Sequence, residues 1–396
     1  MLDNKPFKNI GFNYYPLIIN LPSPTYVEQL AQEWEDNGVR IVRTWLFINL
    51  MGSIQTVGGV PTLVWSQQKI DQLDMVLGVL DAHGIKLVVS FADNTYYNTK
   101  PAVCGWSDTL YGTSLVSAGY PYIGFFNNTN CRDLYKQFIA MLANRYKDDD
   151  RIAYWELGNE LRIDLFTSEG GTQNTAGSQN LALMVEWSET MASYFKSLDT
   201  NHMVNLGAME HTWEWINGDT VSNGSGYGID YKTHATSTVL DMVDFHCYPN
   251  QSGTELHKYG QRLGFPNAIS GVGFKAQITD YVKVAHVNNK PIVCGEIGFD
   301  KDISGSTLYY PLHPRHNAFK EFFNDFFGVG GDVAFIWHAA RGLTSGGSYD
   351  VAVGATGSPN VNDNNNDTKT MSLVAQWNAK LAGKRIPVNT VEGISL

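Results

Sequence analysis

The stretch IAYWELGNELR, residues 152–162, begins as an apolar, strand-forming run and then carries two carboxylates and an arginine. An unpaired charge in a buried strand is costly, so each carboxylate needs either a partner or a chemical role. Glu156 lies within the apolar run, and there we expect a structural carboxylate satisfied by a basic or hydroxyl partner. Glu160 lies where the strand ends, in a position from which a side chain can act on a substrate.

Seven other runs resemble residues 152–158, and together they form a series of eight predicted strands. Several are apolar nearly throughout, as expected for parallel strands covered on both faces. Helix-like segments separate them. This alternation predicts an α/β fold, a (β/α)8 TIM barrel with long loops at the C-terminal face, formed by residues 1–396 as a single domain. The predicted strands are residues 10–15, 39–45, 86–93, 152–158, 203–209, 242–248, 291–299 and 333–340.

The segments between the strands carry the signals that begin and end helices. In residues 23–38, Ser23 is the expected N-cap, Pro24 takes the first helical position and Gly38 follows the last turn. Residues 66–84 begin at a serine and end at a glycine in the same way. A doubly wound open sheet is the rival architecture, but it would carry a glycine-rich loop after the first strand, and residues 13–24 have none.

Long segments follow several of the predicted strands, and we expect them to form loops at the C-terminal mouth of the barrel. The run NDNNND, residues 362–367, could hold a calcium ion, but a solvated polar loop is the preferred interpretation. The long segments are residues 94–128, 163–180, 211–240, 250–274 and 341–369.

The composition favours a neutral, hydroxyl-rich partner. The net charge is −11 and the chain has no run of Lys and Arg, so nucleic acid and anionic membranes are poor partners. The 10 Trp and 20 Tyr suit ligands with an apolar face and many hydroxyl groups. No apolar run approaches the roughly 20 residues that cross a bilayer. The start of the chain lacks the apolar part of a signal peptide, so we expect either a secreted protein whose leader has been removed or a cytoplasmic one.

The four cysteines match no zinc spacing. Cys104 and Cys131 flank one loop-like segment and could form a disulfide. Cys247 and Cys294 lie in predicted strands and are expected to be buried thiols.

Polar side chains gather at the C-terminal ends of the predicted strands, which converge on one mouth in a barrel. Among them, Glu160 and Glu296 end strands on opposite sides. Paired carboxylates across a cleft are what glycoside hydrolysis requires, one to protonate the leaving oxygen and one to attack or to activate water. The polar residues are Arg43, Asn94, Asn159, Glu160, Glu210, His211, His246, Tyr248, Glu296, Trp337 and His338.

With these residues in place, the chain resembles the clan A retaining glycoside hydrolases. Within that clan it is similar to glycoside hydrolase family five, and it looks most like the β-mannanase (mannan endo-1,4-β-mannosidase) branch. The resemblance rests on motifs in the right order over nearly the whole barrel. They are VRIVRTW (39–45), SFADN (90–94), WELGNELR (155–162), GAMEH (207–211), FHCYP (245–249), KPIVCGEIG (290–298) and IWHA (336–339).

The resemblance implies a role for each matching residue. Glu160 would be the general acid/base and Glu296 the nucleophile, with Asn159 bonding the sugar 2-hydroxyl. Arg43 and Tyr248 would hydrogen-bond Glu296 and keep it ionised, while His246 would set the protonation of Glu160. Trp337 would be the platform under the sugar at the cleavage point. Glu210 and His211 match residues that bind neighbouring sugars, although a surface pair is an equal alternative.

Several departures from the family leave the sugar specificity open. Leu161 replaces the usual proline after Asn-Glu, Ala92-Asp93-Asn94 replaces a more common sequence after the third strand, and no second acid precedes Glu296. The insert that carries Trp106 could close part of the cleft and favour exo cleavage.

The resemblance implies a hydrolase acting on β-1,4-linked mannan, glucomannan or galactomannan. The alternatives are a β-1,4-glucanase, an exo-β-mannosidase or a carbohydrate-binding barrel without catalysis. Trp45, Trp213 and Trp215 could stack on sugars, with core or rim packing as the commoner fate of a tryptophan. No cofactor is expected and no metal, because the first strand lacks the His-x-His of metal-dependent barrel hydrolases.

Overall fold

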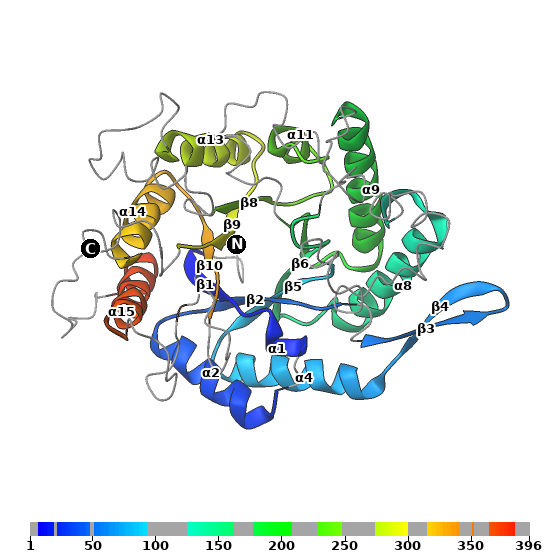
Figure 1. Ribbon diagram of the computed structural model, residues 1–396, viewed down its shortest axis with the longest axis horizontal. Helices are drawn as coiled ribbons and strands as arrows, with labels where there is room; N and C mark the ends of the chain where they lie inside the picture. Colours follow the sequence, from blue (N-terminus) through cyan, green and yellow to red (C-terminus); the bar gives the residue numbers. More distant parts are fainter. Residues whose placement is uncertain are drawn as a thin grey trace, which may run out of the picture.

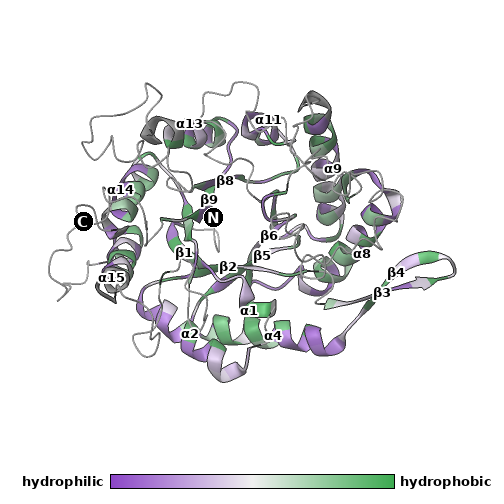
Figure 2. Ribbon diagram, viewed as in Figure 1, coloured by the Kyte–Doolittle hydropathy of each residue, from purple (hydrophilic) through white to green (hydrophobic). Residues whose placement is uncertain are grey.

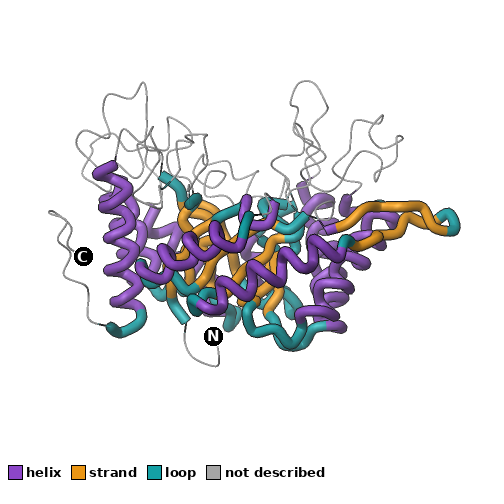
Figure 3. Tube along the Cα trace, turned by 90° about the horizontal axis from the view of Figure 1, so that it is seen from below, coloured by secondary structure: helices purple, strands orange, loops and turns teal. Residues whose placement is uncertain are grey.

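The structure, a computed structural model, describes residues 7–19, 22–47, 51–92, 125–161, 177–207, 228–247, 274–299, 315–339, 351 and 364–384. In these ranges eight parallel strands form one sheet that curves into a nearly closed barrel (Figure 1). Figure 1 also shows helices around the strands, and Figure 3 shows the same arrangement from the side. The predicted (β/α)8 TIM barrel is confirmed.

All eight predicted strands are present, and most of them stop before the predicted run ends. Several described residues just beyond these strands, such as Phe91 and Leu157, still donate a backbone hydrogen bond to the neighbouring strand although the regular ladder has ended. In the order of the sheet, the strands are β7 (Met203–Asn205), β6 (Ile152–Glu156), β5 (Lys86–Ser90), β2 (Ile41–Trp45), β1 (Asn9–Asn13), β10 (Val333–Ile336), β9 (Ile292–Ile297) and β8 (Val243–Cys247).

A helix follows every strand of the barrel in the sequence. Figure 2 shows hydrophobic and hydrophilic residues mixed along most of these helices, as expected for elements with one face on the barrel and one in solvent. The helices are α1 (Pro16–Ile19), α2 (Pro24–Asp36), α4 (Gln67–Ala82), α8 (Thr129–Tyr146), α9 (Gly177–Leu198), α11 (Tyr231–Ala235), α13 (Phe274–Val287), α14 (Arg315–Gly328) and α15 (Asn364–Leu381).

The predicted helix ends are confirmed at α2 and α4. The Ser23 side chain accepts a hydrogen bond from the backbone nitrogen of Tyr26, and Ser66 occupies the N-cap position of α4. Gly38 (φ 69°) and Gly84 (φ 64°) end these helices in the left-handed region that glycine adopts at little cost. Both helices therefore begin and end where the sequence signals place them.

Other parts of the prediction are wrong. Helix α11 lies within the predicted loop 211–240, and α9 begins within the predicted loop 163–180. Residues 364–367 of the run NDNNND begin α15 instead of forming a polar loop.

A β-hairpin that was not predicted, β3 (Gly52–Val57) and β4 (Val60–Trp65), projects from the barrel (Figures 1 and 3). Its two-residue turn is Gly58-Gly59, and both glycines have positive φ. A glycine pair between two β-branched runs is itself a hairpin signal.

Side chains help to close the barrel between β7 and β8, the two ends of the sheet order. Asn205 Nδ2 donates to Asp244 Oδ2 at 2.8 Å. At the preceding residue of β7, the Val204 nitrogen donates to Asp241 Oδ2 at 2.8 Å. The Asp241 nitrogen donates back to the Val204 oxygen at 2.9 Å. These contacts bring β8 close to β7 at the side of the barrel that carries His246.

Further predictions differ in how far the structure tests them. Cys247 and Cys294 are buried, as predicted. Cys104 lies outside the described residues, so its disulfide with the buried Cys131 stays a prediction, as does the single domain over residues 1–396. Within the described ranges, no helix has both the length and the apolar character needed to span a bilayer.

Candidate active site

Arg43, near the end of β2, is the centre of a hydrogen-bonded cluster at the C-terminal mouth of the barrel. It is fully buried. Its Nε donates to Glu156 Oε2 at 2.8 Å. One terminal nitrogen donates to Glu296 Oε1 at 3.0 Å and to Asn13 Oδ1 at 2.9 Å. The other donates to Asn159 Oδ1 at 2.7 Å. One guanidinium therefore fixes side chains that come from four parts of the barrel.

Charge holds this cluster together. Burial alone would lower the pKa of Arg43, but the neighbouring carboxylates of Glu156 and Glu296 outweigh burial and raise it, so the guanidinium stays charged. Burial raises the pKa of Glu156, while Arg43 acts against that rise. The expected basic partner of Glu156 is therefore Arg43, the same residue that holds Glu296.

Glu296 lies beside His246 because β9 contains a bulge. Phe245 pairs with Cys294 and His246 pairs with Glu296, so Gly295 is an extra residue in β9. A Cβ atom at Gly295 would lie 2.7 Å from His246 Nε2 and 2.7 Å from Asp244 Oδ1, so this position requires glycine. Bulges next to active sites commonly redirect a side chain, and this one places the Glu296 carboxylate next to the imidazole.

Glu160 reaches the same place from the segment that follows β6. The backbone nitrogens of Leu157, Gly158 and Asn159 donate to the strands on either side, at 2.9, 3.1 and 2.6 Å. Glu160 then adopts a φ of 49°, in the left-handed region that a non-glycine residue seldom occupies. Such conformations cluster at functional sites, where the surrounding structure must enforce them.

The two glutamates and His246 form one compact group. His246 Nδ1 lies 2.7 Å from Glu160 Oε1 and 3.5 Å from Glu296 Oε2. One oxygen of each carboxylate and a ring nitrogen lie within 4.8 Å of one another. Retaining glycosidases hold their carboxyl groups about 5–5.5 Å apart, whereas inverting enzymes need about 6.5–9.5 Å to admit water. The spacing of Glu160 and Glu296 is too short for the inverting arrangement and is close to that of retaining enzymes.

The same three groups have the spacing of a metal site. Each of the three has a hydrogen-bonding or ionic partner within the cluster. Together with the Arg43 guanidinium they form a set of one cation, two carboxylates and an imidazole. Such a set can hold a metal ion or can transfer protons to and from a bound molecule.

An aromatic group lies at the end of β10, the strand that pairs with β9. Trp337, just after β10, stacks on Tyr15 with ring centroids 6.0 Å apart and an interplanar angle of 14°. The ring centroids of Trp45 and Trp337 lie 5.6 Å apart, and Trp45 is only 2% exposed, so it packs against Trp337 and has little surface of its own for stacking. Trp337 is partly exposed, and its predicted role as a sugar platform stays a prediction.

The structure brings together Arg43, Asn159, Glu160, His246 and Glu296, with Trp337 and Trp45 beside the mouth. The other predicted site residues, Asn94, Glu210, His211 and Tyr248, lie outside the described residues, as do Trp106, Trp213 and Trp215.

Sequence reasoning missed several members of the cluster. Asn13 donates to the Gly295 oxygen at 2.9 Å and accepts from Arg43. Asp244 Oδ1 accepts from the Gly295 nitrogen at 3.0 Å and so holds the bulge in place. Both residues carried the signal that was used for Glu156, since each is a polar residue within an apolar strand run.

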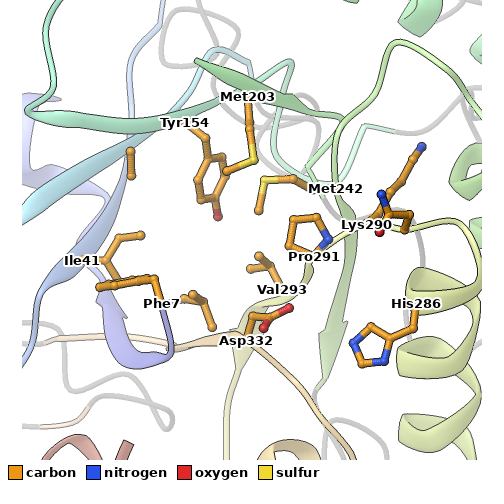
Figure 4. A pocket seen from close by; sticks show the side chains of 13 residues that line it. Phe7, Ile41, Tyr154, Met203, Met242, His286, Lys290, Pro291, Val293 and Asp332 are labelled. Atoms are coloured by element: carbon orange, nitrogen blue, oxygen red, sulfur yellow. The ribbon is translucent and has the colours of Figure 1, made fainter. Parts of the chain in front are cut away.

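A separate cavity of about 620 Å³ lies at the opposite end of the barrel. Figure 4 shows its lining, which includes Ile41, Tyr154, Met203 and Val293 from β2, β6, β7 and β9. None of the clustered carboxylates lines it. The cavity is therefore separate from the cluster at the C-terminal mouth, and its lining residue Tyr154 lies on the same strand as the buried Glu156.

Comparison with known proteins points to one family. A family model described as "GH family 5 beta-mannosidase-like" matches residues 119–330. The chain is 25% identical over 324 residues to mannan endo-1,4-beta-mannosidase F of Aspergillus clavatus, covering 78% of this chain and 64% of that protein. It is 26% identical over 343 residues to mannan endo-1,4-beta-mannosidase 7 of Arabidopsis thaliana, covering 79% and 71%. The chain thus spans less than two thirds of the first relative.

Solved structures show the same architecture. The endo-beta-1,4-mannanase from Thermotoga petrophila superposes with a TM-score of 0.71 at 21% identity, over 98% of this chain and 80% of that one. At this identity the similarity establishes the barrel fold.

Proposed function

Since the chain belongs to the β-mannosidase-like members of glycoside hydrolase family 5, we propose that it hydrolyses β-1,4-mannosidic bonds of mannan, glucomannan or galactomannan with retention of configuration. The observation that carries this proposal is the pair of carboxylates, Glu160 and Glu296, within 4.8 Å of each other and joined by His246.

In the first step, a Glu296 oxygen attacks the anomeric carbon while the bond from that carbon to the leaving oxygen breaks. Glu160 donates its proton to that oxygen, which leaves a glycosyl ester on Glu296. In the second step, Glu160 takes a proton from water, and the water oxygen attacks the anomeric carbon and releases Glu296. Two displacements restore the original configuration and return each carboxyl group to its starting state.

The neighbours of the two glutamates support these roles. Arg43 donates to one oxygen of Glu296 at 3.0 Å, a contact that favours the ionised form of the attacking carboxylate and orients it. Asn159 accepts from Arg43 through its carbonyl oxygen, which fixes the amide so that its nitrogen faces away from the guanidinium. That nitrogen is the group we assign to the sugar 2-hydroxyl, a contact that strengthens in the transition state. We assign Trp337 to the sugar at the cleavage point.

A substrate panel tests the proposal. Purified protein is incubated with β-1,4-mannan, galactomannan, cellulose and xylan, and the reducing sugar and the product sizes are followed from the first minutes. We expect release from the mannans with mixed oligosaccharides as early products, and none from the Glu296→Ala variant. Release of mannose alone would establish the exo alternative, and preference for cellulose would establish the glucanase.

Absence of hydrolysis on every β-linked substrate would contradict the proposed function and favour a binding barrel. Because such polymers cannot enter a cell, we also propose that the enzyme acts outside the cell. We propose further that it consists of one domain and needs no cofactor.

A further inference from the structure

Glu156 is a buried carboxylate that the proposed reaction does not use. Glu156 is the last residue of β6 and is 0% exposed. Its partner is the Nε edge of Arg43, while another edge of the same guanidinium holds Glu296. A carboxylate that only stabilised the barrel would need a cation, but it would not need the cation of the active site.

The two carboxylates compete for one positive charge. Each negative charge beside Arg43 offsets part of the field that the guanidinium exerts on the other, and the low dielectric of the barrel interior strengthens this effect. The titratable groups that face Glu156 and Glu296 from the surrounding described strands and loops are Arg43, Tyr154, Glu160, Asp244, His246 and Cys294. Of these, only Arg43 bonds to both carboxylates.

We propose that Glu156 is a positioning residue that holds Arg43 and, through it, sets the basicity of Glu296. This inference rests on the proposed role of Glu296 as nucleophile. With Glu156 ionised, Arg43 keeps Glu296 charged but does not stabilise it so strongly that it becomes a poor nucleophile. Loss of the Glu156 charge would let the full charge of Arg43 act on Glu296.

The burial of Glu156 makes its charge sensitive to the surroundings. Burial raises its pKa, with Arg43 opposing that effect. Its free energy of ionisation is therefore coupled to that of Glu296, and the two groups should titrate as a pair.

The pH dependence of kcat/KM for Glu156→Gln tests the proposal. The glutamine keeps the shape and an acceptor for Arg43 but removes the negative charge. We expect the acidic limb to move to lower pH by about one unit and kcat to fall by about tenfold, with KM nearly unchanged because Glu156 touches no substrate. A Glu156→Asp variant retains the charge and should bring the acidic limb back toward that of the unmodified protein.

Asp149→Asn is the matched control. Asp149 also pairs with an arginine, Arg151, but at the opposite end of β6. Its loss should lower stability and leave the acidic limb in place. If Glu156→Gln gives the same result, Glu156 is a purely structural carboxylate and the proposal is wrong.

A second measurement needs no variant of Glu156 and no turnover. The Glu296 carboxyl carbon can be followed by ¹³C NMR against pH, with its signal assigned by its loss in Glu296→Gln. We expect a curve with two steps, the second coinciding with the titration of Glu156; a single step would overturn the coupling. The result stands whether or not Glu296 is the nucleophile, so it separates this proposal from the proposed function.

Discussion

At the scale of single residues, the backbone of Glu160 shows how the site is built. Its φ of 49° is unfavourable for a side chain with a Cβ, and three backbone hydrogen bonds just before it hold the segment between the neighbouring strands. The conformation directs the carboxylate toward His246, at 2.7 Å. The rest of the segment thus enforces a strained position at the residue we assign as the acid.

We predict that Glu160→Ala will lose activity according to the leaving group. A polysaccharide leaving group needs the proton, so kcat on mannan should fall by about 10²–10⁴-fold. An aryl β-mannoside with an acidic phenol needs no proton, so its first step should be nearly unaffected. Steady-state kinetics on both substrates measure the difference, and equal losses would argue against the acid role of Glu160.

The different roles of Glu156 and Glu160 could be predicted from sequence, because one lies within an apolar run and the other at its end. The sharing of Arg43 could not. A sequence shows which side chains reach the mouth, but the donor that each one contacts depends on register and on the bulge in β9.

At the scale of elements, the bulge in β9 sets the register in which β8 and β9 pair. It thereby places the side chains of His246 and Glu296 next to each other. We predict that Gly295→Ala will lower kcat/KM by about 100-fold or more, because the added Cβ would lie 2.7 Å from His246 Nε2 and displace it. Circular dichroism should still show a folded barrel.

The matched control is Gly78→Ala in α4, where an added Cβ meets nothing within 4 Å. This substitution should leave kcat/KM unchanged and add about 0.5–1 kcal/mol of stability, as alanine favours a helix over glycine. Full activity in Gly295→Ala would show that the close approach at the bulge is unimportant.

Helices α2 and α4 are joined by a histidine whose charge depends on pH. His83 Nδ1 lies 2.8 Å from Glu35 and Nε2 lies 3.0 Å from Glu28. Burial works to lower the pKa of His83, but the two glutamates outweigh it and raise the pKa. Protonated His83 therefore stabilises the folded protein fully below the ordinary histidine pKa of about 6.5. This stabilisation is lost as pH rises through the higher pKa that His83 has in the folded protein.

We predict that His83→Gln will lower the melting temperature by about 1–2 °C more at pH 5.5 than at pH 9, a modest effect because both glutamates are exposed. Scanning calorimetry at both pH values measures it. His286→Gln, at an exposed histidine of α13, serves as the control. An equal drop in melting temperature at both pH values would show that His83 acts by packing alone.

The elements themselves could be predicted because strand runs, N-caps and terminal glycines are local signals, as at Ser23 and Gly38. The strand ends, α11 and the β3–β4 hairpin could not be placed as well. Where a ladder stops depends on the neighbouring strand, and residues 364–367 show that polar composition alone does not distinguish a loop from a helix end.

At the scale of the whole molecule, the barrel depends on contacts between the two ends of the described chain. Asn378 in α15 is buried and binds β1 through its amide group: Oδ1 accepts from the Ile10 nitrogen at 2.8 Å, and Nδ2 donates to the Ile10 oxygen at 3.1 Å. The last helix is therefore attached to the first strand, and β1 in turn carries Asn13 into the active-site cluster.

We predict that Asn378→Ala will lower the free energy of unfolding by about 2–3 kcal/mol, since it leaves buried backbone groups of β1 without partners. Chemical denaturation measures the change. Ser372→Ala, at a half-buried position on the same helix, should cost far less. Equal losses in the two variants would mean that α15 is held by apolar packing alone.

The overall barrel could be predicted because the order of strands and helices admits few topologies. The closure of the barrel through Asn205, Asp241 and Asp244 could not, because it depends on side chains of two strands that meet only in the folded chain.

The most direct test of the catalytic assignment is to trap the intermediate. The protein is treated with 2-deoxy-2-fluoro-β-mannosyl fluoride, whose good leaving group allows the first step while the fluorine slows the second. Peptide mass spectrometry then locates the attached sugar. We expect a single label on Glu296 that matches the loss of activity, and a label on Glu160 or Glu156, or no label on a protein that cleaves mannan, would contradict the double displacement at Glu296.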